Sequence, residues 1–382
     1  MKQTARIISI YSSDTAGVCS VLYELGGLTV VHDASGCNST YATHDEPRWA
    51  DMDSMVYISA LTEMDAVQGN DERLICDVVR TAEELHPRFI ALCGSPMPLM
   101  IGTDFPAVAE ELERRTGLPV FGFRTNGMDS YLKGASDALS AYLERFCTDA
   151  VRQSRSVNII GATPLDFALN GSVESIRNWL TENGFSIQSC MTMGSTPEEI
   201  AGAGGAGVNL VISSCGLKSA EYLRNRFGTP WVCGVPCGKV FAGILAEKLR
   251  EAERRDVCLV PCADRTVPEG KCLSIVGEPL NASSLAAAVR LECGIPARAL
   301  CPAALKADVP LAPGDVTAEC EDSMAEEFRR SAGILADPLY EPLCPAGAVF
   351  HRYPHEAFSG RCFEQEIPDF VNRKLETEMF AI

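Results

Sequence analysis

The sequence predicts an α/β fold of three Rossmann-like domains, in which parallel sheets flanked by helices surround a central cleft. Two observations predict this class. Short apolar runs typical of buried strands alternate with amphipathic helical patterns along the chain, which is the order of a parallel sheet covered on both faces. The 382 residues are also enough for two or three domains with separate cores.

The alternation is clearest in the middle of the chain. Residues 157–162, 185–191 and 208–215 are apolar runs that predict strands. Residues 172–184 and 218–228 lie between or after them, and each carries a helical pattern that ends in glycine. The chain therefore repeats the order strand, helix, strand here, as a doubly covered sheet requires.

The same order predicts a domain on either side of this one. Residues 88–94, 104–117 and 118–125 read as strand, helix and strand, and so do three segments within residues 271–302. Polar, basic stretches near residues 151–156 and 253–256 suit the junctions between the units. We therefore predict three domains with these bounds: 1–153, 154–256, and 257–382 with a C-terminal tail.

Charge and composition narrow the class of function. The formal net charge of −18 argues against nucleic acid as a partner, because phosphate contacts need a basic surface. No apolar run is long enough to cross a bilayer and the first residues lack a signal-peptide pattern, so we expect no membrane partner and a cytoplasmic protein. Seventeen cysteines in a reducing compartment favour metal ligation or buried thiols over disulfides.

Three cysteines stand out by their surroundings. Cys19, Cys37 and Cys93 each follow an apolar run and lie beside glycine, proline or other small residues, where a strand would give way to a loop or a helix. Soft thiolates on backbone that allows close approach suit an iron–sulfur cluster. The alternative is three buried structural cysteines. Cys215 follows a predicted strand in the same way, and ligands of open α/β sheets bind at such ends.

Four blocks of sequence carry a resemblance to a known family. They are residues 30–45, 59–74, 87–112 and 209–232, with a weaker block at 354–361. In these blocks the chain resembles the nitrogenase component 1 family, which includes nitrogenase molybdenum–iron protein subunits, cofactor-assembly scaffolds and dark-operative protochlorophyllide reductase components. The chain is shorter than a typical nitrogenase subunit, so we expect peripheral insertions to be missing.

The resemblance implies an iron–sulfur cluster at a subunit interface. By it, Cys19, Cys37 and Cys93 from each of two protomers would hold an 8Fe-7S-like or 4Fe-4S cluster across a two-fold axis, in a homodimer or a heterodimer with a related chain. His32 would orient the cluster loop, or else is a satisfied core histidine. An ATP-dependent iron-protein reductase would be a further partner, in keeping with the absence of a G-x4-G-K-[ST] motif in this chain.

The resemblance also implies a second metallocluster in the cleft between the domains. Cys215 is similar in position to the family cysteine that anchors it, and His355 to the histidine at its other end. The alternatives are a packed strand-end thiol and a surface or turn histidine. A different metal site is suggested by spacing alone, through two C-x3-C pairs: Cys233 with Cys237, and Cys258 with Cys262.

Together these observations predict an enzyme, a nitrogenase-like oxidoreductase. It would be the iron–sulfur component of a two-component ATP-dependent reductase, accepting electrons from the separate iron protein and reducing a substrate in the cleft. One alternative is a metallocluster assembly scaffold or carrier. Another is a cluster-free interaction protein that retains the fold.

Overall fold

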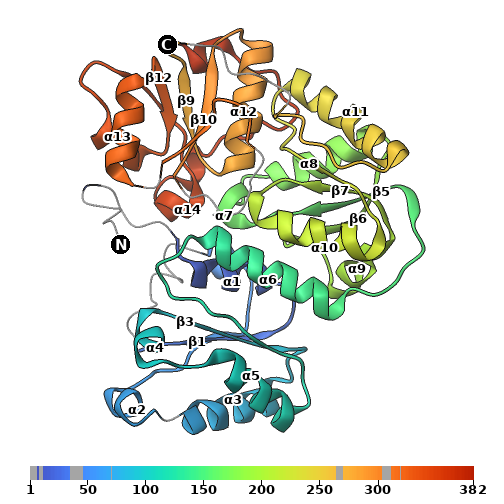
Figure 1. Cartoon of the computed structure of the whole chain (residues 1–382), viewed down its shortest axis with the longest axis vertical. Coiled ribbons are helices and arrows are strands. Elements are labelled where there is room, and N and C mark those ends of the chain that lie inside the picture. The colour runs from blue at the N-terminus through green and yellow to red at the C-terminus, as the bar shows by residue number, and fades with distance from the viewer. Residues whose placement is uncertain are drawn as a thin grey trace.

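The computed structural model of the chain describes residues 7, 12–34, 46–69, 71–263, 270–302, 311–318 and 320–382. It confirms the predicted fold class, because three sheets of purely parallel strands are each flanked by helices. Figure 1 shows the first sheet at the bottom, the second at the right and the third at the top. Cys37 lies outside the described residues, so its predicted role stays a prediction.

The first sheet has four strands in the order β2-β1-β3-β4. β1 and β3 form its centre, with Val31 opposite Cys93 and His32 opposite Gly94, so both strands end at the same edge. Apolar strand residues and the inner faces of α3 and α5 form one core beneath this sheet. The elements are β1 (Leu28–His32), β2 (Val56–Ile58), β3 (Ile90–Gly94), β4 (Val120–Gly122), α1 (Asp14–Leu22), α2 (Glu63–Gln68), α3 (Asp71–Leu85), α4 (Pro96–Ile101), α5 (Phe105–Thr116) and α6 (Tyr131–Phe146).

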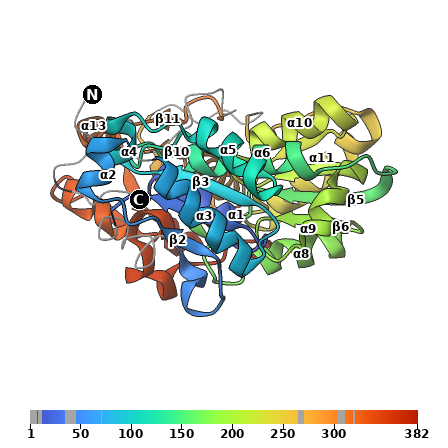
Figure 2. The same cartoon turned by 90° about the horizontal axis from the view of Figure 1, so that it is seen from below.

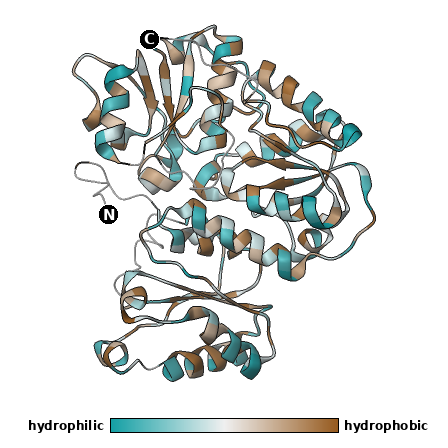
Figure 3. Ribbon diagram, viewed as in Figure 1, coloured by the Kyte–Doolittle hydropathy of each residue, from teal (hydrophilic) through white to brown (hydrophobic). Residues whose placement is uncertain are grey.

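The second sheet has the order β6-β5-β7-β8 and is almost entirely buried at its centre. Its valines and isoleucines suit strands covered on both faces, because branched side chains pack well on a pleated surface. Figure 3 shows these strands in brown, while the outer helices alternate between brown and teal. The elements are β5 (Gln153–Ile160), β6 (Ser186–Met191), β7 (Ala206–Val211), β8 (Trp231–Cys233), α7 (Pro164–Phe167), α8 (Ser172–Glu182), α9 (Pro197–Ala201), α10 (Leu217–Phe227) and α11 (Lys239–Arg255).

The third sheet has five strands in the order β11-β10-β9-β12-β13. Glu278 begins α12 directly after β9, where its carboxylate accepts a hydrogen bond from the backbone N–H of Asn281. Helix α12 is buried along most of its length and packs on α11 of the second domain. The elements are β9 (Leu273–Val276), β10 (Ala297–Cys301), β11 (Val316–Thr317), β12 (Gly333–Ala336), β13 (Val349–Arg352), α12 (Pro279–Glu292), α13 (Glu321–Arg330) and α14 (Glu356–Ser359).

Helices α1 and α6 connect the first domain to the other two. They lie between the first sheet and the upper domains in Figure 1, and the view in Figure 2 places the first domain in front of the third. Glycines allow the two helices to touch, because a Cβ on Gly17 or Gly134 would collide with the backbone of the other helix. The close contact places the first turns of α1 and α6 where the domains meet.

Among the residues that the structure describes, no helix combines the length and the apolar character that crossing a membrane requires.

Candidate functional site

Cys93 lies at the carboxyl edge of the first sheet, as the sequence predicts. It is the penultimate residue of β3 and is fully buried, with its Sγ 3.9 Å from the backbone oxygen of Val30. β1 ends at His32, directly opposite Gly94, and the chain leaves there toward Cys37, five residues later. We call this place the first-sheet edge, meaning the ends of β1 and β3 with His32, Cys93 and Gly94.

Cys19 does not follow a strand, so that part of the prediction was wrong. It lies inside helix α1, all nine residues of which are buried. The helix nevertheless faces the first-sheet edge, because Thr15, one turn earlier, donates a hydrogen bond to the backbone oxygen of Gly94 at 2.8 Å. Cys19 and Cys93 belong to the same apolar core. The structure therefore places the helix that carries Cys19 against the end of the strand that carries Cys93, rather than placing both cysteines at strand ends.

His32 is a buried ring at this edge. Its Nδ1 lies 2.8 Å from the Ser59 hydroxyl, and its ring meets Phe105 edge-on at 6.1 Å between centroids. Burial lowers the pKa of the His32 imidazole below its ordinary value, which favours the neutral ring. The hydrogen bond to Ser59 fixes the orientation of the ring. A role for His32 in orienting the cluster loop stays a prediction.

Arg48 anchors the chain where it returns after the segment that holds Cys37. Its guanidinium is 4 % exposed and pairs with Glu46 at 2.6 Å and with Glu24 at 2.8 Å. It also donates a hydrogen bond to the backbone oxygen of Ser20 in α1, next to Cys19. These buried ion pairs hold residues 46–48 against α1, because a guanidinium that pairs with two carboxylates has little freedom to move.

Cys215 lies where the second and third domains meet, four residues beyond β7, in a 3₁₀ turn (Ser214–Gly216). It is fully buried. Burial and the neighbouring Asp166 and Glu278 carboxyls raise the pKa of its thiol well above the ordinary value. Asp166 follows β5 and Glu278 follows β9, so strand ends from two sheets deliver acidic groups to this thiol, which therefore stays protonated.

His355 is buried at the same place, so the alternative of a surface histidine was wrong. It is 4 % exposed, caps α14, and lies 3.7 Å from an Asp166 carboxyl oxygen. Its backbone N–H donates to Asp337, and its ring stacks on Phe358. Among the described residues neither ring nitrogen has a hydrogen-bond partner, and burial lowers the pKa of the imidazole to about 4. The ring is thus neutral and has unused donor and acceptor capacity.

The sequence analysis missed the acidic groups around these two residues. We call the set the domain junction, and its members are Tyr131, Asp166, Cys215, Glu278, His355 and Glu356. The Tyr131 hydroxyl donates to Asp166 at 2.5 Å, and Glu278 accepts from the backbone N–H of Ser214 at 2.7 Å. Burial raises the pKa values of both carboxyls, and the neighbouring Asp166 carboxylate raises the pKa of Glu278 further. The sequence did contain a signal for Glu278, because this residue lies at the end of a predicted strand, as Cys93 does.

Glu356 is the third acidic side chain of the domain junction. It is 2 % exposed, and among the described residues neither of its carboxyl oxygens has a hydrogen-bond partner. Burial raises the pKa of this carboxyl to about 8. Unpartnered buried polar groups are costly and mark places where a ligand or water is expected. Because the pKa values of Asp166, Glu278 and Glu356 are raised to about 6, 7 and 8, these three carboxyls allow the domain junction to hold protons near neutral pH.

The domain junction does not fit a resident metallocluster in this arrangement. The cavity beside His355 and Glu356 has a volume of about 30 Å³, which is room for one or two water molecules. Within the described ranges no group of three histidine, cysteine or acidic side chains is arranged to hold a metal ion, and this also leaves the two C-x3-C pairs without a formed site. Cys215 and His355 as cofactor ligands therefore stay predictions.

The fold and these two sites define a three-domain α/β protein with thiols at one sheet edge and buried acids at the domain junction. A profile of the nitrogenase component 1 type oxidoreductase family matches residues 15–308, and the chain belongs to this family.

Several curated relatives match part of the chain. The chain is 26 % identical over 177 residues to the nitrogenase iron-molybdenum cofactor biosynthesis protein NifE of Clostridium pasteurianum, covering 45 % of this chain and 38 % of that protein. It is 25 % identical over 249 residues to one of the subunits of the light-independent protochlorophyllide reductase of Prosthecochloris aestuarii, covering 62 % of this chain and 46 % of the relative. The matches thus span less than half the length of these relatives.

A solved structure supports the fold. The chain superimposes on a structure titled "Nitrogenase Cp1 at pH 5" with a TM-score of 0.65 and 16 % identity, covering 95 % of this chain and 86 % of that one. Identity this low establishes the shared fold alone.

Proposed function

We propose that the protein is the iron–sulfur component of a two-component reductase and works in the cytoplasm as a dimer. Cys37 and Cys93, with Cys19 as a third ligand, would hold a cluster between two protomers. When bound, the cluster would supply one-electron transfer. Electrons would come from a separate ATP-dependent iron protein, and a substrate in the cleft between the domains would receive them. Family membership and the geometry of the first-sheet edge support this proposal.

The observation that carries the proposal is the surface beside Cys93. Helix α4 begins three residues after Cys93 and is a neighbour of α2. Six exposed apolar side chains of these two helices form what we call the α2–α4 patch, and their exposed fractions are Met64 63 %, Val67 84 %, Met97 38 %, Leu99 52 %, Met100 86 % and Ile101 40 %. Contiguous exposed apolar surface marks protein contacts, and methionine suits adaptable ones. A cluster ligand beside a contact surface supports a cluster between subunits.

At the domain junction this chain's own residues would handle protons. Tyr131 donates to Asp166, and Asp166 lies beside the ring of His355. Burial raises the pKa of Glu278 to about 7 and that of Glu356 to about 8, so both carboxyls exchange protons near neutral pH. A substrate that receives electrons needs protons at the same time, and acids with pKa values near the working pH supply them well.

The experiment that tests this function is anaerobic turnover. The chain is purified without oxygen, its iron is quantified, and an ATP-dependent iron-protein reductase is added with ATP. We expect bound iron and a change in the cluster's electron paramagnetic resonance signal that requires both the reductase and ATP. A preparation without iron that takes up none on reconstitution contradicts the proposal. A Cys190→Ala variant, which removes a fully buried thiol of β6, is the matched control and should keep its iron.

A metallocluster scaffold is the second candidate, and the match to NifE relatives from two organisms favours it. A scaffold would pass its cofactor to an acceptor protein instead of returning to its starting state. The same preparation distinguishes the two functions. Iron that leaves the chain for an added apo-acceptor, with no ATP-dependent reduction cycle, identifies a scaffold. Iron that stays bound through repeated reduction cycles identifies the reductase component.

A further inference from the structure

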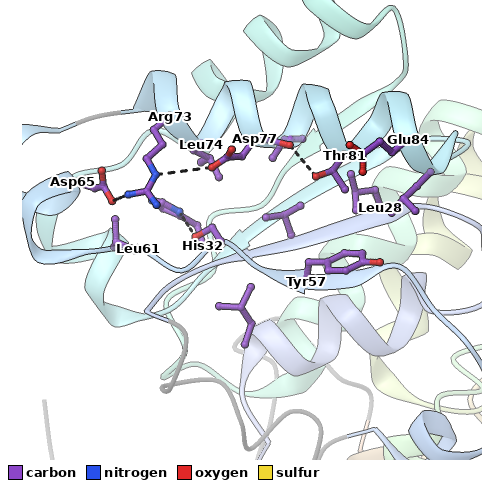
Figure 4. A pocket seen from close by; sticks show the side chains of 15 residues that line it. Leu28, His32, Tyr57, Leu61, Asp65, Arg73, Leu74, Asp77, Thr81 and Glu84 are labelled. Atoms are coloured by element: carbon purple, nitrogen blue, oxygen red, sulfur yellow. Dashed lines mark hydrogen bonds and ion pairs between the residues drawn. The ribbon is translucent and has the colours of Figure 1, made fainter.

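A groove in the first domain begins beside His32 of the first-sheet edge and runs away from it, and it shares no residue with the domain junction. It runs between helix α3 and the β1–β2 side of the first sheet, and its volume is about 380 Å³ (Figure 4). We call it the α3 groove. It exists because α3 packs on the sheet through Leu74 and Val78, while β2 is a short edge strand of three residues. Pockets of this volume suit small molecules.

About half of the side chains that line the α3 groove are apolar. Leu28 and Val30 of β1 contribute from the sheet, Ile58 from β2, and Val78 from α3. These side chains would contact the apolar body of a ligand. Water forms no hydrogen bonds with these apolar side chains, so an apolar group that covers them is favoured over solvent.

One end of the α3 groove is already electrostatically satisfied. Arg73 lies there with its guanidinium 2.5 Å from Asp65 and 3.9 Å from Asp77, close to His32 (Figure 4). Arg80 also pairs with Asp77 at 2.8 Å. The two aspartates therefore have basic partners, and this end presents no unbalanced charge to a ligand.

The other end carries an unbalanced carboxylate. Glu84 lies there near Leu28 and the ring of Tyr57, which is 46 % exposed (Figure 4). In the part of the chain that the structure describes, no basic side chain lies within ion-pair distance of Glu84. A carboxylate and an aromatic ring at one end of an apolar groove are the groups that bind an ammonium ion.

We propose that the α3 groove binds a small molecule with an apolar body and one ammonium group. The apolar body would lie on Leu28, Val30 and Val78, and the ammonium would face Glu84 and the Tyr57 ring. This ligand would bind in the first domain whether or not the chain carries iron. The proposal is therefore independent of the reductase function.

The test compares n-hexylammonium with n-hexanol and hexanoate as probes on the full chain, by isothermal titration calorimetry and ligand-observed NMR. We expect n-hexylammonium to bind about threefold to fivefold more tightly than n-hexanol, as one exposed ion pair and one cation–π contact allow. Hexanoate should bind most weakly. Absence of n-hexylammonium binding, or equal affinity for all three probes, would overturn the proposal.

Three variants locate the probe. Glu84→Gln should reduce the affinity for n-hexylammonium to about that for n-hexanol and leave n-hexanol unchanged. Glu83→Gln is the matched control, because Glu83 is an exposed neighbour that does not line the groove. This variant should change neither the affinity for n-hexylammonium nor that for n-hexanol. Thr81→Trp should fill the groove and abolish the binding of both probes. The circular dichroism spectrum of this variant verifies that it is folded. Unchanged binding in Glu84→Gln or in folded Thr81→Trp contradicts the assignment.

Discussion

The first-sheet edge and the domain junction both lie at the carboxyl ends of parallel strands, but they differ in what surrounds their cysteines. Cys93 lies beside α4, which with α2 exposes apolar side chains, whereas Cys215 is fully buried beside the Asp166 and Glu278 carboxyls, at a junction whose cavity has a volume of about 30 Å³. The first arrangement supports contact with another protein, and the second supports proton storage. The same strand-end rule therefore locates a site without identifying its chemistry.

The largest expected effect concerns the anchor of the first-sheet edge. Arg48→Met should lower the free energy of unfolding by about 3–5 kcal/mol, because it leaves the buried Glu46 carboxylate without its partner. Urea unfolding measures it. Arg80→Met, which breaks a pair whose arginine is 69 % exposed, should cost about 0–1 kcal/mol and serves as the control. Equal effects would show that Arg48 is not a structural anchor.

The second prediction uses the oligomeric state to test whether the α2–α4 patch, beside the first-sheet edge, forms a dimer interface. Met100→Glu in the α2–α4 patch should weaken the dimer by roughly 30-fold or more, because it places a charge at the centre of an apolar contact. Analytical ultracentrifugation measures the dissociation constant. Val151→Glu changes another apolar residue that is 86 % exposed, but at a distant position in the chain, and should leave the dimer intact. A dimer that tolerates Met100→Glu removes the patch from the interface.

The third effect concerns pH at the domain junction. Burial raises the pKa of the Glu278 carboxyl above its ordinary value of 4.5, so the folded state retains a proton that the unfolded state loses. The resulting stability is fully present below the unfolded pKa and is lost as the pH rises through the folded pKa. The Glu278→Gln variant has no carboxyl to titrate at this position, so it does not lose this stability as the pH rises. Its free energy of unfolding should be about 1–3 kcal/mol below that of the parent chain at pH 5, and this difference should be smaller at pH 8.

The control for this pH effect is Glu292→Gln. Glu292 also accepts two backbone N–H groups, from Val240 and Leu375, but at a partly exposed position. Urea unfolding of this variant at pH 5 and pH 8 measures the loss of a carboxylate that accepts backbone N–H groups at a less buried position, and the Glu278→Gln effect is compared with it. A Glu278→Gln effect that is the same at pH 5 and pH 8 would contradict the raised pKa.

The smallest effect tests the orientation of His32. Ser59→Ala removes the hydroxyl that lies 2.8 Å from His32 Nδ1 and should cost about 1 kcal/mol of unfolding free energy. If His32 orients the cluster loop, the variant should also release iron to a chelator faster than the parent chain. Thr81→Ala, which removes a hydroxyl bonded to a backbone oxygen in α3, is the control for the chelator measurement. Unchanged iron release would restrict Ser59 to a structural role.

The sequence predicted the second sheet well because periodicity is a local signal, whereas it did not predict β11, β12 and β13 of the third sheet. The predicted strands and helices of residues 157–228 correspond to β5, α8, β6, β7 and α10. Cys19 was misplaced because every residue of α1 is buried, and a fully buried helix has no polar face to distinguish it from a buried strand.

The domain junction was only partly predictable. Cys215 and His355 were identified, but the acids around them come from separate domains, and their proximity depends on how the domains pack. The strand-end rule could have included Glu278 and Asp337, which follow β9 and β12. The small volume of the cavity and the missing partners of His355 depend on side-chain packing, which no sequence pattern encodes.

The most direct test of the central claim is anaerobic native mass spectrometry of the parent chain and a Cys37→Ala, Cys93→Ala double variant. The account predicts iron in the dimer of the parent chain and none in the double variant. Iron carried by the monomer, or iron retained in full by the double variant, would contradict a cluster held by thiols at the first-sheet edge between two protomers.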